Sequence, residues 1–158
     1  MRLTVTICLL LSMATALVLA GCGGGDPRGE TELQAQAQAL IQGAQTELQG
    51  QFRIESDDRR LRVELDTGGL PLGQPVSFCL VTSSGSTPLS APQLVTGKGQ
   101  EFAQFQLDSG AGQTVPSVIA GNQLEAREGA SSSGAVDCSA PLLLSATFQP
   151  DVDKPGGH

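Results

Sequence analysis

The sequence predicts a mainly β protein: a small antiparallel β-sandwich of about seven or eight strands, preceded by one N-terminal helix. Three observations support this fold class. From residue 51 onward, short segments alternate apolar and polar side chains, as strands with one buried face do. The chain contains 20 glycines and 9 prolines, which favour many turns. Two cysteines, Cys79 and Cys138, lie far apart within the β-rich part. A small β-barrel is the alternative architecture.

Residues 32–50 are expected to form the helix. Apolar side chains recur there at three- and four-residue steps, which places them on one helix face: Leu33, Ala37, Leu40, Ile41, Ala44 and Leu48. Thr31, with Gln34 three residues later, fits a capping box. This stripe is rich in alanine, so the helix needs a surface to pack on. The alternation of Gln and Ala is also typical of low complexity, and a partly disordered stalk is the alternative.

Residues 51–149 are expected to form the sandwich. Leu61, Val63 and Leu65 alternate with charged residues, which is the clearest pattern of a half-buried strand. Further strands are predicted at 76–81, 102–107 and 142–148, among weaker ones. All five Phe fall on strand positions, so we expect them in the core. Residues 150–158 are predicted to be a disordered tail.

The N-terminal residues 1–21 have the properties of a secretory signal peptide. Arg2 supplies a positive charge, and no charged residue follows until after residue 21. The segment ends in Leu19-Ala20-Gly21-Cys22, which resembles the lipobox of bacterial lipoproteins at every position. The resemblance implies that a lipid is attached to the Cys22 thiol and that the chain is cleaved between Gly21 and Cys22. An uncleaved transmembrane helix is the alternative, although 18 uncharged residues are marginal for a span.

The lipobox resemblance also implies a location. Acyl chains such as palmitate on Cys22 would hold the protein at the cell membrane or the outer membrane, with the domain facing the periplasm or the exterior. Residues 22–31, rich in glycine, are then a flexible tether. Gly23 follows Cys22 where an Asp would favour retention at the inner membrane, which favours the outer membrane if the organism has one.

The cysteines predict one disulfide. The chain has four, of which Cys8 leaves with the signal peptide and Cys22 is used by the lipid. Cys79 and Cys138 remain, and a remaining pair in an exported protein is usually bridged. Two free thiols are the other outcome. A redox or metal pair is disfavoured because the two cysteines lack Cys-x-x-Cys spacing and a nearby histidine.

The charge balance argues against nucleic acid as a partner. The whole chain has a formal charge of −7, and removal of Arg2 with the signal peptide makes the remainder more negative still. Such a domain repels phosphate backbones. The basic cluster of Arg59, Arg60 and Arg62 has acidic neighbours on both sides, so we interpret it as locally compensated rather than anion-binding.

The residue types give no catalytic site, no metal site and no cofactor motif. The single histidine is His158, the last residue, so a Ser-His-Asp arrangement has no base in the predicted domain and zinc has no imidazole ligand there. Carboxylates at predicted strand ends (Asp57, Asp58, Asp66 and Asp108) could serve a glycosidase, but the chain has no Trp or Tyr for a sugar to stack on. Calcium held by acidic loops is the remaining possibility.

The sequence therefore predicts a non-catalytic envelope lipoprotein, not an enzyme. Its sandwich is similar in pattern, though not in any motif, to the small immunoglobulin-like modules of envelope proteins. The expected role is structural or protein-binding, with an envelope protein as partner. A lipoprotein that binds a small ligand or calcium is the alternative function.

Overall fold

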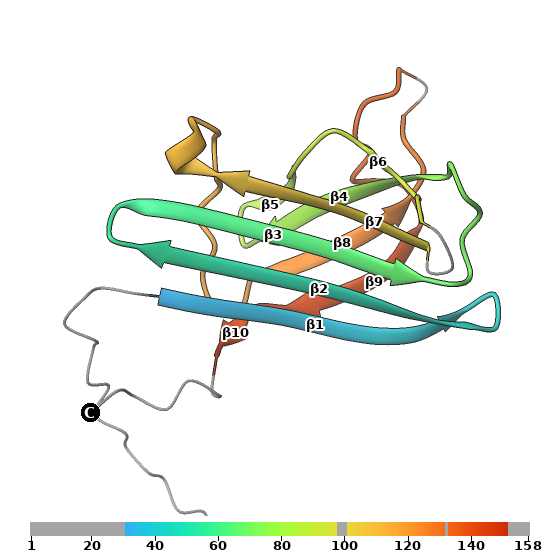
Figure 1. Cartoon of the computed structure of the whole chain (residues 1–158), viewed down its shortest axis with the longest axis horizontal. Helices are drawn as coiled ribbons and strands as arrows, with labels where there is room; N and C mark the ends of the chain where they lie inside the picture. Colours follow the sequence, from blue (N-terminus) through green and yellow to red (C-terminus); the bar gives the residue numbers. More distant parts are fainter. Residues whose placement is uncertain (1–30, 98–100, 132, 152–158) are drawn as a thin grey trace, which may run out of the picture.

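The computed structural model describes residues 31–97, 101–131 and 133–151. Within them the chain is mainly β and forms two antiparallel sheets stacked face to face (Figure 1). The sandwich prediction is confirmed at this level, and the strands do not close into the alternative barrel. Cys22, Gly21 and the predicted signal and tether up to residue 30 lie outside the described residues, as does His158.

The first sheet has the strand order β10-β1-β2-β3-β7. Its strands are β1 (Thr31–Ile41), β2 (Ala44–Glu55), β3 (Asp58–Thr67), β7 (Glu101–Asp108) and β10 (Gln149–Pro150). The first three strands form a meander of consecutive hairpins, and a short 3-10 helix, η1 (Ser109–Ala111), follows β7. The strands predicted around Leu61–Leu65 and 102–107 are β3 and β7.

The second sheet has the strand order β5-β4-β8-β9, and β6 pairs with β4 beside this path. Its strands are β4 (Pro75–Thr82), β5 (Gly85–Pro88), β6 (Gln93–Leu94), β8 (Gln123–Glu128) and β9 (Leu142–Thr147). The chain crosses between the sheets several times, and its last crossing is made by Phe148, between β9 and β10.

The predicted N-terminal helix over 32–50 is wrong, because these residues form most of the hairpin β1–β2. The apolar positions fit both periods: Leu33 and Ala37 are four apart, which also keeps them on one side of a strand. The intervening Ala35 is buried while Gln34, Gln36 and Gln38 are exposed, so the observed period is two. Leu40, which the helical stripe would bury, is 76% exposed.

A tight turn at Gln42 and Gly43 fixes this hairpin. Ile41 pairs with Ala44, and the two residues between them have φ of 51° and 83°. Positive φ at both central positions is the geometry that matches the right-handed twist of a two-residue hairpin. Glycine adopts it without steric cost, so Gln42-Gly43 marks the turn within the stretch predicted to be one helix.

The core lies between the sheets and takes its large side chains from both. The fully buried ones include Phe52, Phe78, Phe148, Leu48, Leu61, Leu65 and Leu124. Phe105 packs against Phe78 with ring centroids 5.5 Å apart. Phe102 is the exception to the expectation for Phe: it is half-buried, and strand alternation places it on the opposite face of β7 from buried Ala103.

Gly50 lets the two sheets approach closely at the middle of β2. A Cβ atom there would lie 2.7 Å from a methyl carbon of Leu124 and 3.1 Å from the Phe148 ring. Such distances are below normal contact, so a side chain at this position would push the sheets apart. The glycine therefore belongs to the packing of the core rather than to a turn.

The sandwich extends beyond the predicted limits of 51–149 at both ends. It includes all of β1 and the start of β2, and Pro150 pairs with Leu33 although it was assigned to the disordered tail. Residues 152–158 of that tail lie outside the described residues. Among the described residues, no helix is long and apolar enough to cross a membrane.

Candidate functional site

The outer face of the first sheet is a continuous polar surface, which we call the amide face. Strand alternation directs most apolar residues of β1, β2, β3 and β7 inward and most polar ones to this side. The amide face consists of Gln34, Gln36, Gln38, Glu47, Gln49, Gln51, Arg53, Arg60, Arg62, Glu64, Gln104 and Gln106. Most of these side chains are exposed, and none of the described strands covers them.

The register of the strands aligns these side chains in rows that cross the sheet. One row is made of Gln34, Gln51, Arg62 and Gln106. The neighbouring row is made of Gln36, Gln49, Glu64 and Gln104. Directly opposed residues on adjacent strands lie about 5 Å apart. Each row therefore places amide groups on both sides of one charged group from β3.

Two carboxylates orient several of the amides. The Oε1 atom of Glu47 accepts hydrogen bonds from Nε2 of Gln36 and, at 2.8 Å, from Nε2 of Gln49. These bonds, the one from Gln49 first, lower the pKa of Glu47 below its ordinary value. The Oε1 atom of Glu32 accepts from Nε2 of Gln51 at 2.7 Å and from Arg53 at 3.0 Å. The bonded amides keep their carbonyl oxygens available as acceptors.

Two depressions cross the amide face and share residues. The larger has a volume of about 420 Å³, and its polar lining is Gln34, Gln36, Gln49, Gln51, Arg62 and Glu64. The smaller, of about 170 Å³, is lined by Gln51, Arg53, Arg60, Arg62 and Gln106. Since Gln51 and Arg62 line both, the two form one trough. Amide, guanidinium and carboxylate groups along it offer donors and acceptors side by side, which suits a polar ligand rather than an apolar one.

Two arginines of the basic cluster pair with carboxylates, one of them with a residue distant in sequence. Arg62 pairs with Glu64 at 3.1 Å, and Arg60 pairs with Asp108 on β7 at 2.8 Å. Asp108 also accepts from the backbone N–H of Gly110 at 2.9 Å, which caps η1. The bond from Arg60 lowers the pKa of Asp108, with the Gly110 bond adding to it. The partner of Arg60 was not predicted because it is 48 residues away.

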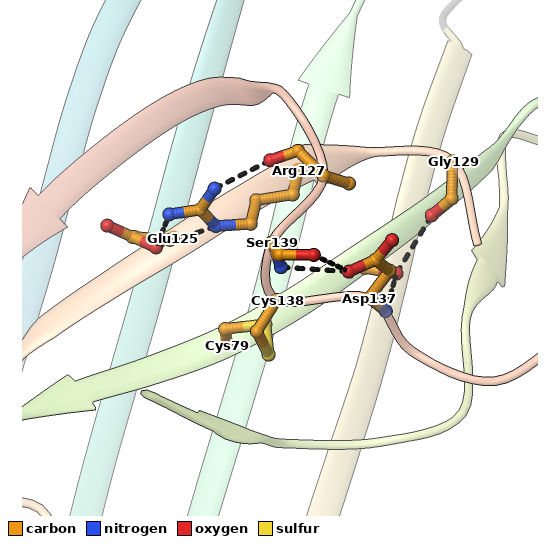
Figure 2. Close-up of a disulfide and its surroundings, with 9 residues drawn as sticks. Cys79, Glu125, Arg127, Gly129, Asp137, Cys138 and Ser139 are labelled. Atoms are coloured by element: carbon orange, nitrogen blue, oxygen red, sulfur yellow. Dashed lines mark hydrogen bonds and ion pairs between the residues drawn. A yellow bond between two sulfur atoms is a disulfide. The ribbon is translucent and has the colours of Figure 1, made fainter. Parts of the chain in front are cut away.

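Cys79 and Cys138 form the predicted disulfide (Figure 2). Their Cα atoms are 5.9 Å apart and they are separated by 59 residues in sequence. Cys79 is fully buried on the outer side of β4, where alternation opposes it to the core residues Phe78 and Leu80. The bridge holds the segment 129–141, which joins β8 to β9, against β4 on the outside of the second sheet.

Hydrogen bonds hold the same segment at further points. The hydroxyl of Ser77 donates to the carbonyl of Gly129 at 2.8 Å and accepts from the backbone N–H of Asp137 at 3.1 Å. The Asp137 carboxylate accepts from the backbone N–H and from the hydroxyl of Ser139, which lowers its pKa. Figure 2 shows Gly129, Asp137 and Ser139 beside the disulfide. The segment is therefore a built cover and not a loose loop.

A partly buried ion pair lies next to the disulfide and was missed by the sequence reasoning. The guanidinium of Arg127 donates to one oxygen of Glu125 from Nε at 2.8 Å and from Nη2 at 2.6 Å. Its Nη1 donates to the carbonyl of Ala140 at 2.6 Å, which joins the pair to the covering segment (Figure 2). The sequence does indicate that these two charges share one face of a strand, because Leu124 and Ala126 alternate with Glu125 and Arg127. The burial of these charges depends on a segment whose path the sequence does not reveal.

Among the other predicted acidic positions, only Asp58 and Asp108 come close together: a Cβ atom at Gly110 would lie 3.3 Å from an oxygen of the first and 3.2 Å from an oxygen of the second. Asp57 and Asp58 lie at the β2–β3 turn, whereas Asp66 lies near the other end of β3. Among the described residues, no group of three or more His, Cys, Asp or Glu side chains is arranged to hold a metal ion. No protein-family model matches the chain, and it matches neither a curated protein nor a solved structure. The amide face is therefore the candidate site on its geometry alone.

Proposed function

We propose that the protein is a non-catalytic lipoprotein of the bacterial envelope, anchored by lipid on Cys22, whose amide face binds a protein partner. The observation that carries the binding role is the amide face itself. It presents two adjacent rows of amides around Arg62 and Glu64, with a trough of about 420 Å³ and about 170 Å³ in its two parts. The proposal has an anchoring part and a binding part, and the two have separate support.

Two features of the chain support the anchor. Leu19-Ala20-Gly21-Cys22 follows an uncharged segment directly, as the lipobox resemblance requires. The Cys79–Cys138 disulfide is the form that cysteines take in oxidising compartments outside the cytoplasm. The residues from Cys22 to the start of β1 then link the lipid to the domain, which faces the periplasm or the exterior.

The chemistry of the amide face favours a protein as its partner. Glutamine side chains carry the same donor and acceptor groups as the peptide backbone, so they can hydrogen-bond with the backbone of a partner polypeptide. The chain has no Trp and no Tyr, the residues on which sugar rings usually stack. Paired charges such as Arg62 with Glu64 can orient a partner on the surface, and they do not make the surface uniformly positive or negative.

The immunoglobulin-like character of the sandwich belongs to this proposal, and the two stacked antiparallel sheets support it. A small polar ligand is a second candidate, favoured by the volume of the trough. A shift of the melting temperature with a panel of polar small molecules, lost in Arg62→Ala, would favour this second candidate. A shift with calcium that a chelator removes would instead point to a cation.

The anchor is tested by the intact mass of the protein from membranes, before and after reduction. We expect a chain that begins at Cys22 with added acyl mass and that gains two hydrogens on reduction. The Cys22→Ala variant should keep residues 1–21 and lose the acyl mass. A wild-type chain of unlipidated mass that retains residues 1–21 would contradict the anchor and support the membrane-span alternative.

The binding role is tested by photo-crosslinking from the amide face in living cells. A photoreactive residue at Gln49, in the centre of the face, should form an adduct with one envelope protein, and Arg62→Ala should reduce it. The matched control is the same residue at Thr87, which is exposed on β5 in the other sheet. Equal labelling from Gln49 and Thr87 would contradict the assignment of the amide face.

A further inference from the structure

The edge of the first sheet at β1 is open over most of its length. β10 pairs with β1 only at Leu33 and Gln34. From Ala35 to Ile41 no described strand pairs with β1 on that side. A depression of about 450 Å³ runs along the start of this edge, between Gln34 and Gln36 on one side and Ser145 and Thr147 of β9 on the other. The edge is therefore accessible.

The backbone groups that point out of this edge can be assigned. The carbonyl of Glu32 accepts from the backbone N–H of Asp151, so even-numbered residues of β1 direct their backbone groups away from β2. Gln36, Gln38 and Leu40 follow in the same phase. Each offers one N–H and one C=O, and among the described strands none pairs with them. This is a template for another strand.

We propose that the open edge of β1 pairs with the same edge of a second copy of this chain, antiparallel and centred on Gln38. This register pairs Gln38 with itself and Gln36 with Leu40 of the other copy. It uses all three outward-facing residues and forms about six backbone hydrogen bonds, two for each pair. On one side β10 ends the free edge, and on the other the turn at Gln42 ends it, so no other antiparallel register uses the edge fully.

The side chains along the edge suit a copy of themselves. At the two-fold axis Gln38 meets its own copy; a charged residue there would repel its copy, whereas a glutamine both donates and accepts. From Leu33 to Ile41 the strand has no charged residue and no proline, the two devices that commonly protect an edge. Pairing would also shelter Leu40, which is 76% exposed.

The charge of the domain does not oppose this contact strongly. The nearest acidic side chain on the same face is Glu47, opposite Gln38 on β2. In the paired sheet the two Glu47 residues are separated by three strand spacings, about 14 Å. This exceeds the Debye length of about 8 Å at physiological ionic strength. Anchoring of the copies in one membrane would raise their local concentration, but the edge contact itself does not require the lipid.

The register is tested by a cysteine at its centre, Gln38→Cys, in the full chain in native membranes. Directly paired residues of this type have Cα atoms about 5.5 Å apart, within the range of disulfides. We expect a reducible dimer on mild oxidation. The matched control is Gln104→Cys, which is exposed on the same face but on β7, beyond β2 and β3.

Several outcomes would overturn this proposal. One is a dimer yield from Gln38→Cys no higher than from Gln104→Cys, and another is a crosslink from residue 38 to a different protein. The wild-type chain serves as a further control, because a reducible dimer without an added cysteine, linked through Cys22 by peptide mapping, would show that Cys22 is free. That result would contradict the lipid anchor and leave the edge pairing to be judged by the difference between the two variants.

A charge at the same position gives a test without crosslinking. Gln38→Lys places two ammonium groups against each other at the two-fold axis. We expect the detergent-extracted wild-type protein and Gln104→Lys to sediment as dimers and Gln38→Lys as a monomer. All three should melt at similar temperatures, since both positions are exposed and the substitutions leave the core intact. A monomeric wild-type protein, or a dimeric Gln38→Lys, would overturn the proposal.

Discussion

The two outer faces of this sandwich differ in how far their charged residues are exposed to solvent. On the first sheet the amide face is open, and the side chains of Arg62 and Glu64 keep 59% and 36% of their accessible surface. On the second sheet the segment 129–141 covers part of the face, and the side chains of Arg127 and Glu125 keep only 19% and 10%. Both faces contain an Arg–Glu pair two residues apart on one strand, so the difference lies in the cover.

Exposed and covered ion pairs are expected to have different roles. A charged pair in water contributes little to stability and is free to meet a ligand. A covered pair must keep all its partners, because a charge left alone under the cover is costly. We therefore expect substitutions on the covered face to change folding and substitutions on the amide face to change binding.

The largest expected effect comes from removal of the disulfide. A double Cys79→Ser and Cys138→Ser variant should lose about 4 kcal/mol of unfolding free energy, as the chain-entropy model gives for a loop closed over 59 residues. Urea unfolding of the variant and of the reduced wild type should agree, because both lack the same link. An unfolding midpoint equal to that of the oxidised wild type would show that the cover does not depend on the bridge.

The ion pairs give a direct contrast between the faces. Arg127→Ala leaves the Glu125 carboxylate under the cover without its partner and takes one hydrogen bond from Ala140, so we expect a loss of about 3 kcal/mol. Arg62→Ala, on the open face, should change the unfolding free energy by less than about 0.5 kcal/mol. Equal losses in urea unfolding for the two variants would remove the distinction between covered and open faces.

The smallest effects are shifts of carboxyl titration. The pKa values of Asp108 and Asp137 lie below their ordinary value of 3.8, the first mainly through Arg60 and the second mainly through Ser139. The stabilisation that goes with a lowered pKa is complete above pH 3.8 and is lost as the pH falls through the folded-state pKa. By NMR titration, Arg60→Gln should raise the pKa of Asp108 alone and Ser139→Ala that of Asp137 alone. A shift of both in either variant would mean that the two sites are linked.

Much of the sandwich followed from the sequence, and the errors have physical reasons. β3 was predicted because Leu61, Val63 and Leu65 fit a period of two and no other. β1 and the part of β2 up to Gly50 were taken for a helix because alanine and leucine at positions 33, 37, 44 and 48 fit both periods. The turn at Gln42-Gly43 was the local signal that would have decided the question.

The candidate site was less predictable than the fold. The amide face depends on the register of the strands β1, β2, β3 and β7, and a shift of one residue would turn its glutamines inward. The disulfide followed from counting cysteines, yet the covered pair of Glu125 and Arg127 depends on where the bridge draws the segment 129–141. Such long-range placement leaves no trace in a local pattern.

The short contact between β10 and the start of β1 brings both ends of the described chain to one end of the domain, which we call a pole. Pro150 pairs with Leu33, so the described chain begins and ends at the same pole (Figure 1). If Cys22 carries lipid, the nine residues to Thr31 reach at most about 30 Å, and this pole faces the bilayer. The opposite pole, which then points away from the bilayer, carries the exposed leucines Leu40, Leu72, Leu94 and Leu142.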